Sequence, residues 1–173
     1  MLHSASDGDS VGARERGEEH MNWIVEGLDR EQLLDRLPAI SGPFRELYQS
    51  VYRLPQVAPE TLELCRLRLA QLHRSDADFA LQEVPVSAER RAQLQDWPRA
   101  SVFTDEQRAC LEFTEVHAMD CGAITDAQAD AVKAHIGEDG LVALLQALGV
   151  FDGLIRLGLL WQAAPAGVHQ HAS

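Results

Sequence analysis

Apolar residues recur at helical spacing along most of this 173-residue chain. One clear stripe follows Pro59 and consists of Leu62, Cys65, Leu69 and Leu72. Intervals of three and four residues place such side chains on one face of a helix. No stretch alternates apolar and polar residues with the period of two that marks a strand. The pattern predicts an all-α fold, a multi-helix bundle in a single domain.

Two helices are expected before Pro59. The stripe within residues 21–37 predicts a helix that ends before Pro38, because the residue preceding a proline disfavours helical geometry. Ser41-Gly42-Pro43 is typical of a helix start, so the second helix is expected from there to Pro55.

Later boundaries carry stronger local signals. Residues 74–75 predict a break, followed by a short helix that ends before Pro85, and residues 87–94 indicate another short helix. Thr104 to Gln107 and Thr125 to Gln128 both match the capping box, in which the Thr hydroxyl accepts the N3 amide and the Gln side chain reaches back. The first box predicts a helix that ends at about Met119. The second predicts a helix that ends at about Ile136, where Gly137 stops it.

Composition divides the chain into three parts. Residues 1–20 are rich in Ser, Gly, Asp, Glu and Arg, which predicts a disordered leader, and they lack the apolar run of a signal peptide. Residues 21–163 are expected to form the helical domain. Residues 164–173 have little to pack and are expected to be a flexible tail.

The apolar segment 141–161 is long enough to span a bilayer. It contains Gln146, Asp152 and Arg156, however, and a charge at the centre of a span costs about 2.5–3.5 kcal/mol. Asp152 and Arg156 are four residues apart with the acid first, which favours a helical ion pair. We therefore expect a buried core helix and no membrane partner.

Charge and cysteines narrow the function classes. The formal net charge of -12 argues against nucleic-acid binding, which needs a basic face, and against adsorption to anionic membranes. Cys65, Cys110 and Cys121 form no C-x-x-C pair and match no zinc signature. Buried, reduced thiols in a cytoplasmic protein are expected, with no metal and no cofactor.

Several segments occur in an order that resembles a known superfamily. They are the run Glu63–Leu72 with its E-L-x-R-L-R pattern, Asp96-Trp97, Phe103–Ala109, and Phe151–Leu157, where Asp152 replaces an asparagine. Together they resemble the carboxymuconolactone decarboxylase and alkyl hydroperoxidase D-like (AhpD-like) superfamily over residues 34–161. The resemblance implies an AhpD-like helical fold and a homo-oligomer, such as a dimer, trimer or hexamer.

The resemblance breaks at the residues that carry the redox chemistry. Redox members of the superfamily place a C-x-x-C just after the E-L-x-R-L-R run and a histidine four residues later, with a glutamate upstream as a proton relay. Glu63 matches the glutamate, but Ser75 and Asp78 stand at the cysteine positions and Gln82 at the histidine position. A serine hydroxyl forms no disulfide, so thiol-based peroxidase chemistry loses its reactive groups.

Five residues are candidates for a catalytic site. Glu63 is the favoured acid or base, Ser75 and Asp78 would bind or orient a substrate, and His73 and His117 are further candidates. Buried acids close together have raised pKa values and suit proton transfer.

Structural roles remain open for each candidate. Ser75-x-x-Asp78 matches a helix cap. Glu63 can pair with Arg66 or Arg68, and the two histidines can be ordinary helix residues. His73 and Asp76 alone do not make a metal site, since two ligands are too few.

Three functions follow as hypotheses. The first is a cofactor-free, non-redox enzyme that acts by acid/base chemistry on a small organic molecule, cyclic or carbonyl-bearing, through decarboxylation, isomerisation or cyclisation. The second is a non-catalytic, oligomeric binding or scaffold protein. The third is a residual peroxidase.

Overall fold

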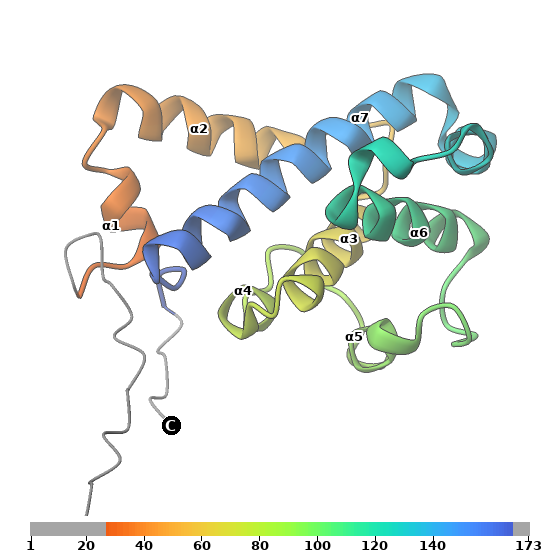
Figure 1. The fold of residues 1–173 in the computed structure, drawn as a ribbon, viewed down its shortest axis with the longest axis horizontal. Coiled ribbons are helices and arrows are strands. Elements are labelled where there is room, and N and C mark those ends of the chain that lie inside the picture. Colours follow the sequence, from red (N-terminus) through yellow and green to blue (C-terminus); the bar gives the residue numbers. More distant parts are fainter. Residues whose placement is uncertain (1–26, 168–173) are drawn as a thin grey trace, which may run out of the picture.

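The computed structural model describes residues 27–167, and every regular element in that range is helical (Figure 1). The elements in chain order are α1 (Arg30–Leu34), α2 (Pro38–Val51), α3 (Pro59–Leu72), α4 (Asp76–Ala80), α5 (Ala88–Gln93), η1 (Leu94–Asp96), α6 (Asp105–Met119), η2 (Cys121–Ala123) and α7 (Asp126–Trp161). The prediction of an all-α fold is confirmed. The leader expected over residues 1–20 lies outside the described residues.

α1 is the described part of the helix expected over residues 21–37. It has five residues and begins at Arg30 because Asp29 caps it. The Asp29 carboxylate accepts the Gln32 N–H at 2.7 Å, and the Gln32 side-chain oxygen accepts the Asp29 N–H at 2.9 Å. This reciprocal cap fixes the position of Arg30, which becomes important at the site.

α2 begins three residues earlier than the sequence predicts. It starts at Pro38 and continues through Pro43 to Val51, so the helix start assigned to residues 41–43 is wrong. Proline suits the first helical position because its fixed φ is already helical and its missing N–H would have no partner there.

α3 is the central helix of the bundle. It contacts α6 and α7 along its length and leads directly into α4 (Figure 1). Nine of its side chains are buried: Thr61, Leu62, Glu63, Leu64, Cys65, Arg66, Leu67, Leu69 and Ala70. Since a buried charge must be paired, the two charged members of this set have to find partners inside the protein.

Both predicted capping boxes are present. Thr104 accepts the Gln107 N–H at 3.1 Å at the start of α6, and Thr125 accepts the Gln128 N–H at 3.3 Å at the start of α7. α6 ends at Met119 as expected. At Gly137 the backbone of α7 kinks with a φ of +75°, a conformation that glycine adopts readily.

α7 is long and apolar enough to cross a membrane by length and composition. Its apolar side chains nevertheless form the main core together with α3 and α6. The buried contributors from α7 include Ala143, Leu144, Ala147, Leu148, Phe151 and Ile155. The helix therefore has the role that the sequence predicts, a core helix.

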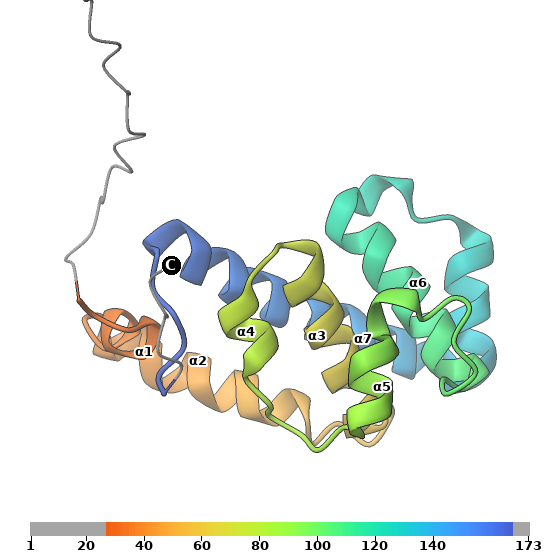
Figure 2. The same cartoon turned by 90° about the horizontal axis from the view of Figure 1, so that it is seen from below.

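The C-terminal segment is more ordered than the sequence predicts. The Ala164 carbonyl accepts the Arg30 N–H at 2.9 Å, the Ala166 N–H donates to Glu31 at 2.6 Å, and Pro165 is buried. Figure 2 shows this segment and α1 at the same end of the molecule as α4. The expected flexible tail is thus wrong for residues 164–166, because α1 supplies the surface that they pack on.

Candidate functional site

α3 places Glu63 and Arg66 on one face, one turn apart, and both are almost fully buried. The Glu63 carboxylate accepts Arg66 Nε at 2.9 Å and Arg66 Nη2 at 2.7 Å. It also accepts the Tyr52 hydroxyl at 2.7 Å and the backbone N–H of Glu83 at 3.1 Å. These four donors occupy both carboxylate oxygens, so Glu63 joins α2, α3 and the segment after α4.

Arg66 extends the same network to α4. Its Nη1 donates to the Asp78 carbonyl at 2.9 Å, and its Nη2 donates to the Leu81 carbonyl at 2.7 Å. A helix leaves its last carbonyl oxygens without internal partners, and a buried guanidinium supplies several donors at once. Arg66 thereby ties the end of α4 to α3.

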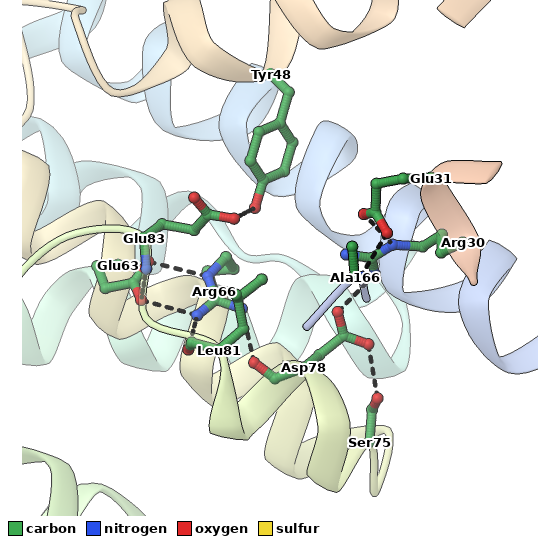
Figure 3. Close-up of polar contacts among 10 residues, drawn as sticks. All are labelled: Arg30, Glu31, Tyr48, Glu63, Arg66, Ser75, Asp78, Leu81, Glu83 and Ala166. Carbon is green, nitrogen blue, oxygen red and sulfur yellow. Dashed lines mark hydrogen bonds and ion pairs between the residues drawn. The ribbon is translucent and has the colours of Figure 1, made fainter. Parts of the chain in front are cut away.

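Ser75 and Asp78 form a second buried pair, and Arg30 completes it. The Asp78 carboxylate accepts the Ser75 hydroxyl at 2.7 Å on one oxygen and Arg30 Nη1 at 2.6 Å on the other. Figure 3 shows this pair beside the Glu63–Arg66 pair, with Arg66 reaching the backbone of Asp78. Three of the predicted site residues, Glu63, Ser75 and Asp78, therefore belong to one buried polar cluster.

Ser75 occupies the N-cap position of α4, but its side chain makes no capping hydrogen bond. The hydroxyl donates to the Asp78 carboxylate instead of accepting a backbone N–H. Helix capping by the Ser75 side chain therefore does not account for this residue. The Ser75 hydroxyl instead supplies a hydrogen bond that the buried Asp78 carboxylate needs.

The structure does not bring the two histidines into this cluster. His73 Nε2 lies 2.5 Å from Asp152 Oδ1, and the other oxygen of Asp152 accepts Arg156 Nε at 2.6 Å. This confirms the predicted Asp152–Arg156 pair and ties the end of α3 to α7. His117 lies in the last turn of α6, and its buried Nδ1 has no hydrogen-bond partner among residues 27–167.

Comparison with known proteins bears on the fold. No family model matches the sequence, and no curated protein matches it. Among solved structures, a protein of unknown function from Agrobacterium tumefaciens, provisionally named the antioxidant defence protein AhpD, aligns with a TM-score of 0.70 at 16% identity. The alignment covers 80% of this chain and 98% of that one. This chain has an AhpD-like fold.

The resemblance inferred from sequence is thus confirmed at the level of the fold, and an identity of 16% carries the likeness no further. In this chain, the two positions that the resemblance assigns to cysteines hold the Ser75–Asp78 pair. What the site can do must therefore be argued from its own side chains and cavities.

Two of the three cysteines lie in the main core, apart from the polar cluster's hydrogen bonds. Cys65 and Cys110 are fully buried in the main core, whereas Cys121 is exposed. Burial raises the pKa of Cys65 to about 12 and also raises the pKa of Cys110 above its usual value. Since the thiolate is the reactive form, neither buried cysteine is suited to redox catalysis at neutral pH.

The extent to which each cysteine is alkylated should decrease with its burial. Iodoacetamide at pH 8 should modify Cys121 in the native protein while Cys65 and Cys110 remain unmodified, and all three should react in denaturant. Intact-mass spectrometry with peptide mapping measures this. Rapid modification of Cys65 in the native protein would contradict the burial argument and would revive the peroxidase hypothesis.

Two cavities lie beside the buried polar cluster. One of about 190 Å³ is lined by Ser75, Ala77, Asp78, Gly158, Leu159, Gln162, Ala163 and Ala164. The other, of about 210 Å³, is lined by Arg30, Glu31, Leu34, Phe44, Arg45, Tyr48, Gln49, Glu83 and Leu154. Glu63 lines neither cavity. The second cavity contains the Tyr48 hydroxyl, which lies 3.3 Å from a carboxylate oxygen of Glu83.

A larger cavity of about 500 Å³ lies between α3, α4 and η1. None of the five predicted site residues lines it. Arg68, on its wall, is held by Glu115 at 2.7 Å and by Gln71 at 2.9 Å. Size alone therefore does not identify the site. Within residues 27–167, no group of three or more His, Cys, Asp or Glu side chains is arranged to hold a metal ion.

Three residues of the site were not predicted from sequence. Glu83 directly follows Gln82, which stands at the superfamily's histidine position. The resemblance therefore identified the neighbouring residue but not Glu83 itself. Tyr48 lies in the second expected helix, and nothing in the sequence marked it as a site residue. Arg30 had no sequence signal, because its role depends on Asp78, which lies 48 residues away.

Proposed function

We propose that this protein is a thiol-independent enzyme that acts by acid/base chemistry on a small carbonyl-bearing molecule bound in the 210 Å³ cavity. The observation that carries the proposal is the Tyr48–Glu83 pair on the cavity wall, with the hydroxyl 3.3 Å from the carboxylate (Figure 3). The cavity is below the roughly 300–1,000 Å³ typical of drug-sized ligands, which favours a small substrate.

The Tyr48–Glu83 pair differs from the buried carboxylates in the number of hydrogen bonds that each carboxylate accepts. Glu63 and Asp78 each have both oxygens occupied by donors, whereas Glu83 is exposed and its carboxylate accepts a hydrogen bond only from Tyr48 among the described residues. Burial raises the pKa of Tyr48 well above its usual value, so its hydroxyl stays protonated and remains a donor. A free base next to a permanent donor suits proton transfer.

The proposed step balances without a cofactor. A Glu83 carboxylate oxygen takes the proton from the carbon next to the substrate carbonyl, and the C–H electron pair moves into a carbon–carbon double bond. The carbonyl π electrons shift to its oxygen, and the Tyr48 hydroxyl turns from Glu83 to donate its hydrogen bond to this oxyanion. In a substrate with a carbon–carbon double bond conjugated to the enolate, return of the proton from Glu83 to the far carbon of that double bond restores the carbonyl and completes an isomerisation. When the carbonyl compound bears a carboxylate, loss of CO₂ forms the same enolate, and protonation completes a decarboxylation.

The predicted catalytic residues take positioning roles in this proposal. Glu63 accepts the Glu83 N–H at 3.1 Å and so sets the backbone that presents the base. Ser75 and Asp78 hold Arg30, which forms part of the cavity wall. His73 and His117 have no part in the step. The role of acid or base, assigned to Glu63 from the sequence, is here proposed for Glu83, because the Glu63 carboxylate has no free acceptor position.

Proton exchange in D₂O tests the proposal. The wild-type protein, incubated with a panel of small ketones, keto acids and unsaturated lactones, should catalyse deuterium uptake next to a carbonyl, followed by proton NMR. Glu83→Gln should abolish this uptake, and Glu89→Gln, an exposed acid on α5, should leave it unchanged. Uptake that survives in Glu83→Gln would refute the assigned base.

A second candidate is an oligomeric binding or scaffold protein, as the sequence also suggested. Exposed apolar side chains on α2 and α7 support it: Ile40 is 58% exposed, Leu47 48% and Val142 49%. Apolar faces of this kind are commonly covered by a second copy of the chain. Homo-oligomerisation and a cytoplasmic location are compatible with either candidate, and free thiols support that location.

Association should depend on α2. Ile40→Glu combined with Leu47→Glu should reduce the mass measured by light scattering to that of a monomer, because two charges would be buried in the interface. Met119→Glu, on the 72%-exposed Met119 of α6, serves as the matched control and should leave the mass unchanged. A wild-type protein that is monomeric at high concentration would contradict this candidate.

A further inference from the structure

Arg30 lies between the two cavities next to the buried polar cluster. Its side chain is 2% exposed and forms part of the wall of the 210 Å³ cavity, while its partner Asp78 lines the 190 Å³ cavity. Its stem runs beside Gly158 of α7, where an added Cβ would lie 3.4 Å from Arg30 Cδ and 3.6 Å from Nη1. The Arg30–Asp78 ion pair therefore connects the walls of the two cavities.

The group that receives Arg30 is suited to a cation. Asp78 is 3% exposed, with one oxygen taken by the Ser75 hydroxyl at 2.7 Å and the other by Arg30 Nη1 at 2.6 Å. A carboxylate buried to this degree needs a positive partner, because an unpaired buried charge is strongly unfavourable. With Arg30 absent, the same two residues would favour any guanidinium or ammonium group that reaches them.

The element that carries Arg30 has few anchors. Only Arg30 and Leu33 of α1 are buried. Besides the Arg30–Asp78 pair, its polar attachments include the hydrogen bonds from Arg30 to Ala164 and from Ala166 to Glu31. Arg45 adds a hydrogen bond to the Glu31 carbonyl at 3.3 Å and a surface pair with Asp35 at 2.7 Å. Segments with little buried apolar surface open locally at a small free-energy cost.

We propose that Ser75 and Asp78 form a binding site for the guanidinium or amino group of a small organic cation, and that Arg30 is an internal ligand that occupies this site until such a cation displaces it. Displacement joins the two cavities, so the cation's organic part extends toward Tyr48 and Glu83. The proposal concerns binding and holds whether or not the Tyr48–Glu83 pair is catalytic.

Removing Arg30 tests the receptor directly. In Arg30→Ala, ethylguanidinium at low millimolar concentration should raise the melting temperature by about 3–6 °C when present at ten times its Kd. The wild-type protein and Arg53→Ala, which loses an exposed arginine that lines neither cavity, should show no comparable rise in melting temperature. Addition of the Asp78→Asn change to Arg30→Ala should remove the effect.

Each outcome of the melting experiment either supports or overturns the proposed cation site. A rise in melting temperature that persists without Asp78, or one of equal size in Arg53→Ala, would show a non-specific salt effect and overturn the proposal. If Arg30→Ala is folded and ethylguanidinium does not raise its melting temperature, the proposal is also overturned. If Arg30→Ala folds only when ethylguanidinium is present, and the double variant does not fold with it, the receptor is supported.

Displacement in the wild-type protein has its own measurement. Agmatine, which carries both a guanidinium and an amine, should speed amide hydrogen exchange at Arg30 and Ala166, because their hydrogen bonds open when Arg30 leaves. Exchange in α6 should stay constant. Agmatine binding without faster exchange at these two amides would show that Arg30 is not displaced and would overturn that part of the proposal.

Discussion

Replacing Glu63 with glutamine should lower the free energy of unfolding by about 3–5 kcal/mol, the usual cost of leaving one partner of a buried ion pair without the other. Glutamine keeps the shape of the side chain but offers only one acceptor oxygen. The Arg66 guanidinium, the Tyr52 hydroxyl and the Glu83 N–H, which all donate to the Glu63 carboxylate, would compete for it. A net positive charge would remain in a place that is almost fully shielded from water.

Urea unfolding followed by circular dichroism measures this loss. Glu60→Gln is the matched control, since Glu60 lies one turn earlier on α3 and its pair with Arg90 is about one-third exposed. That change should cost less than about 1 kcal/mol, as surface pairs do. Equal, small losses in both variants would contradict the assignment of Glu63 as the centre of a structural network.

Replacing Glu83 with glutamine should lower kcat by about 10²- to 10⁴-fold, the usual contribution of a positioned general base. Glutamine cannot take a proton from carbon at neutral pH, and the loss should appear in kcat because the substrate still fits the cavity. Glu83 is exposed, so the variant should keep the wild-type free energy of unfolding. This distinguishes it from Glu63→Gln, where a fall in activity would accompany a fall in stability.

Tyr48→Phe completes the test. Loss of the hydroxyl should cost about 10²- to 10³-fold in kcat, as removal of one donor to a developing oxyanion does. The ring of Tyr48 packs edge-on against Phe151 at 5.7 Å between centroids, and phenylalanine retains that contact. Steady-state kinetics on the substrate found by deuterium exchange, with Glu89→Gln as control, measures both variants. Unchanged kcat in Tyr48→Phe would exclude the hydroxyl from the step.

Much of the helical framework was predictable because its signals are local. A capping box involves residues three apart, and an apolar stripe involves residues three or four apart, so both are readable in a short window. Thr104, Thr125 and Gly137 mark boundaries that the structure shows in the same places. The start of α2 was misread because residues 41–43 are typical of a helix start, while Pro38, three residues earlier, also suits the first helical position.

The candidate site was predictable in part. The superfamily resemblance led to Glu63, Ser75 and Asp78, and these three do meet in one buried cluster. It did not lead to their partners, since Arg30 and Tyr52 come from other helices and the Glu83 contact is a backbone N–H. His73 and His117 satisfied the same residue-type criterion but lie elsewhere, because residue type alone carries no information about direction.

The sequence by itself determined the all-helical fold, most of the helix boundaries and the absence of a C-x-x-C pair, because each depends on residues close together in the chain. Tertiary structure alone decided which carboxylates remain free. Arg66 holds both oxygens of Glu63, whereas Arg30 and Ser75 each hold one oxygen of Asp78, and Glu83 stayed open beside Tyr48. The pairs Glu63–Arg66 and Ser75–Asp78 join residues three positions apart, but the contacts with Tyr52 and Arg30 span 11 and 48 positions, which no local pattern encodes.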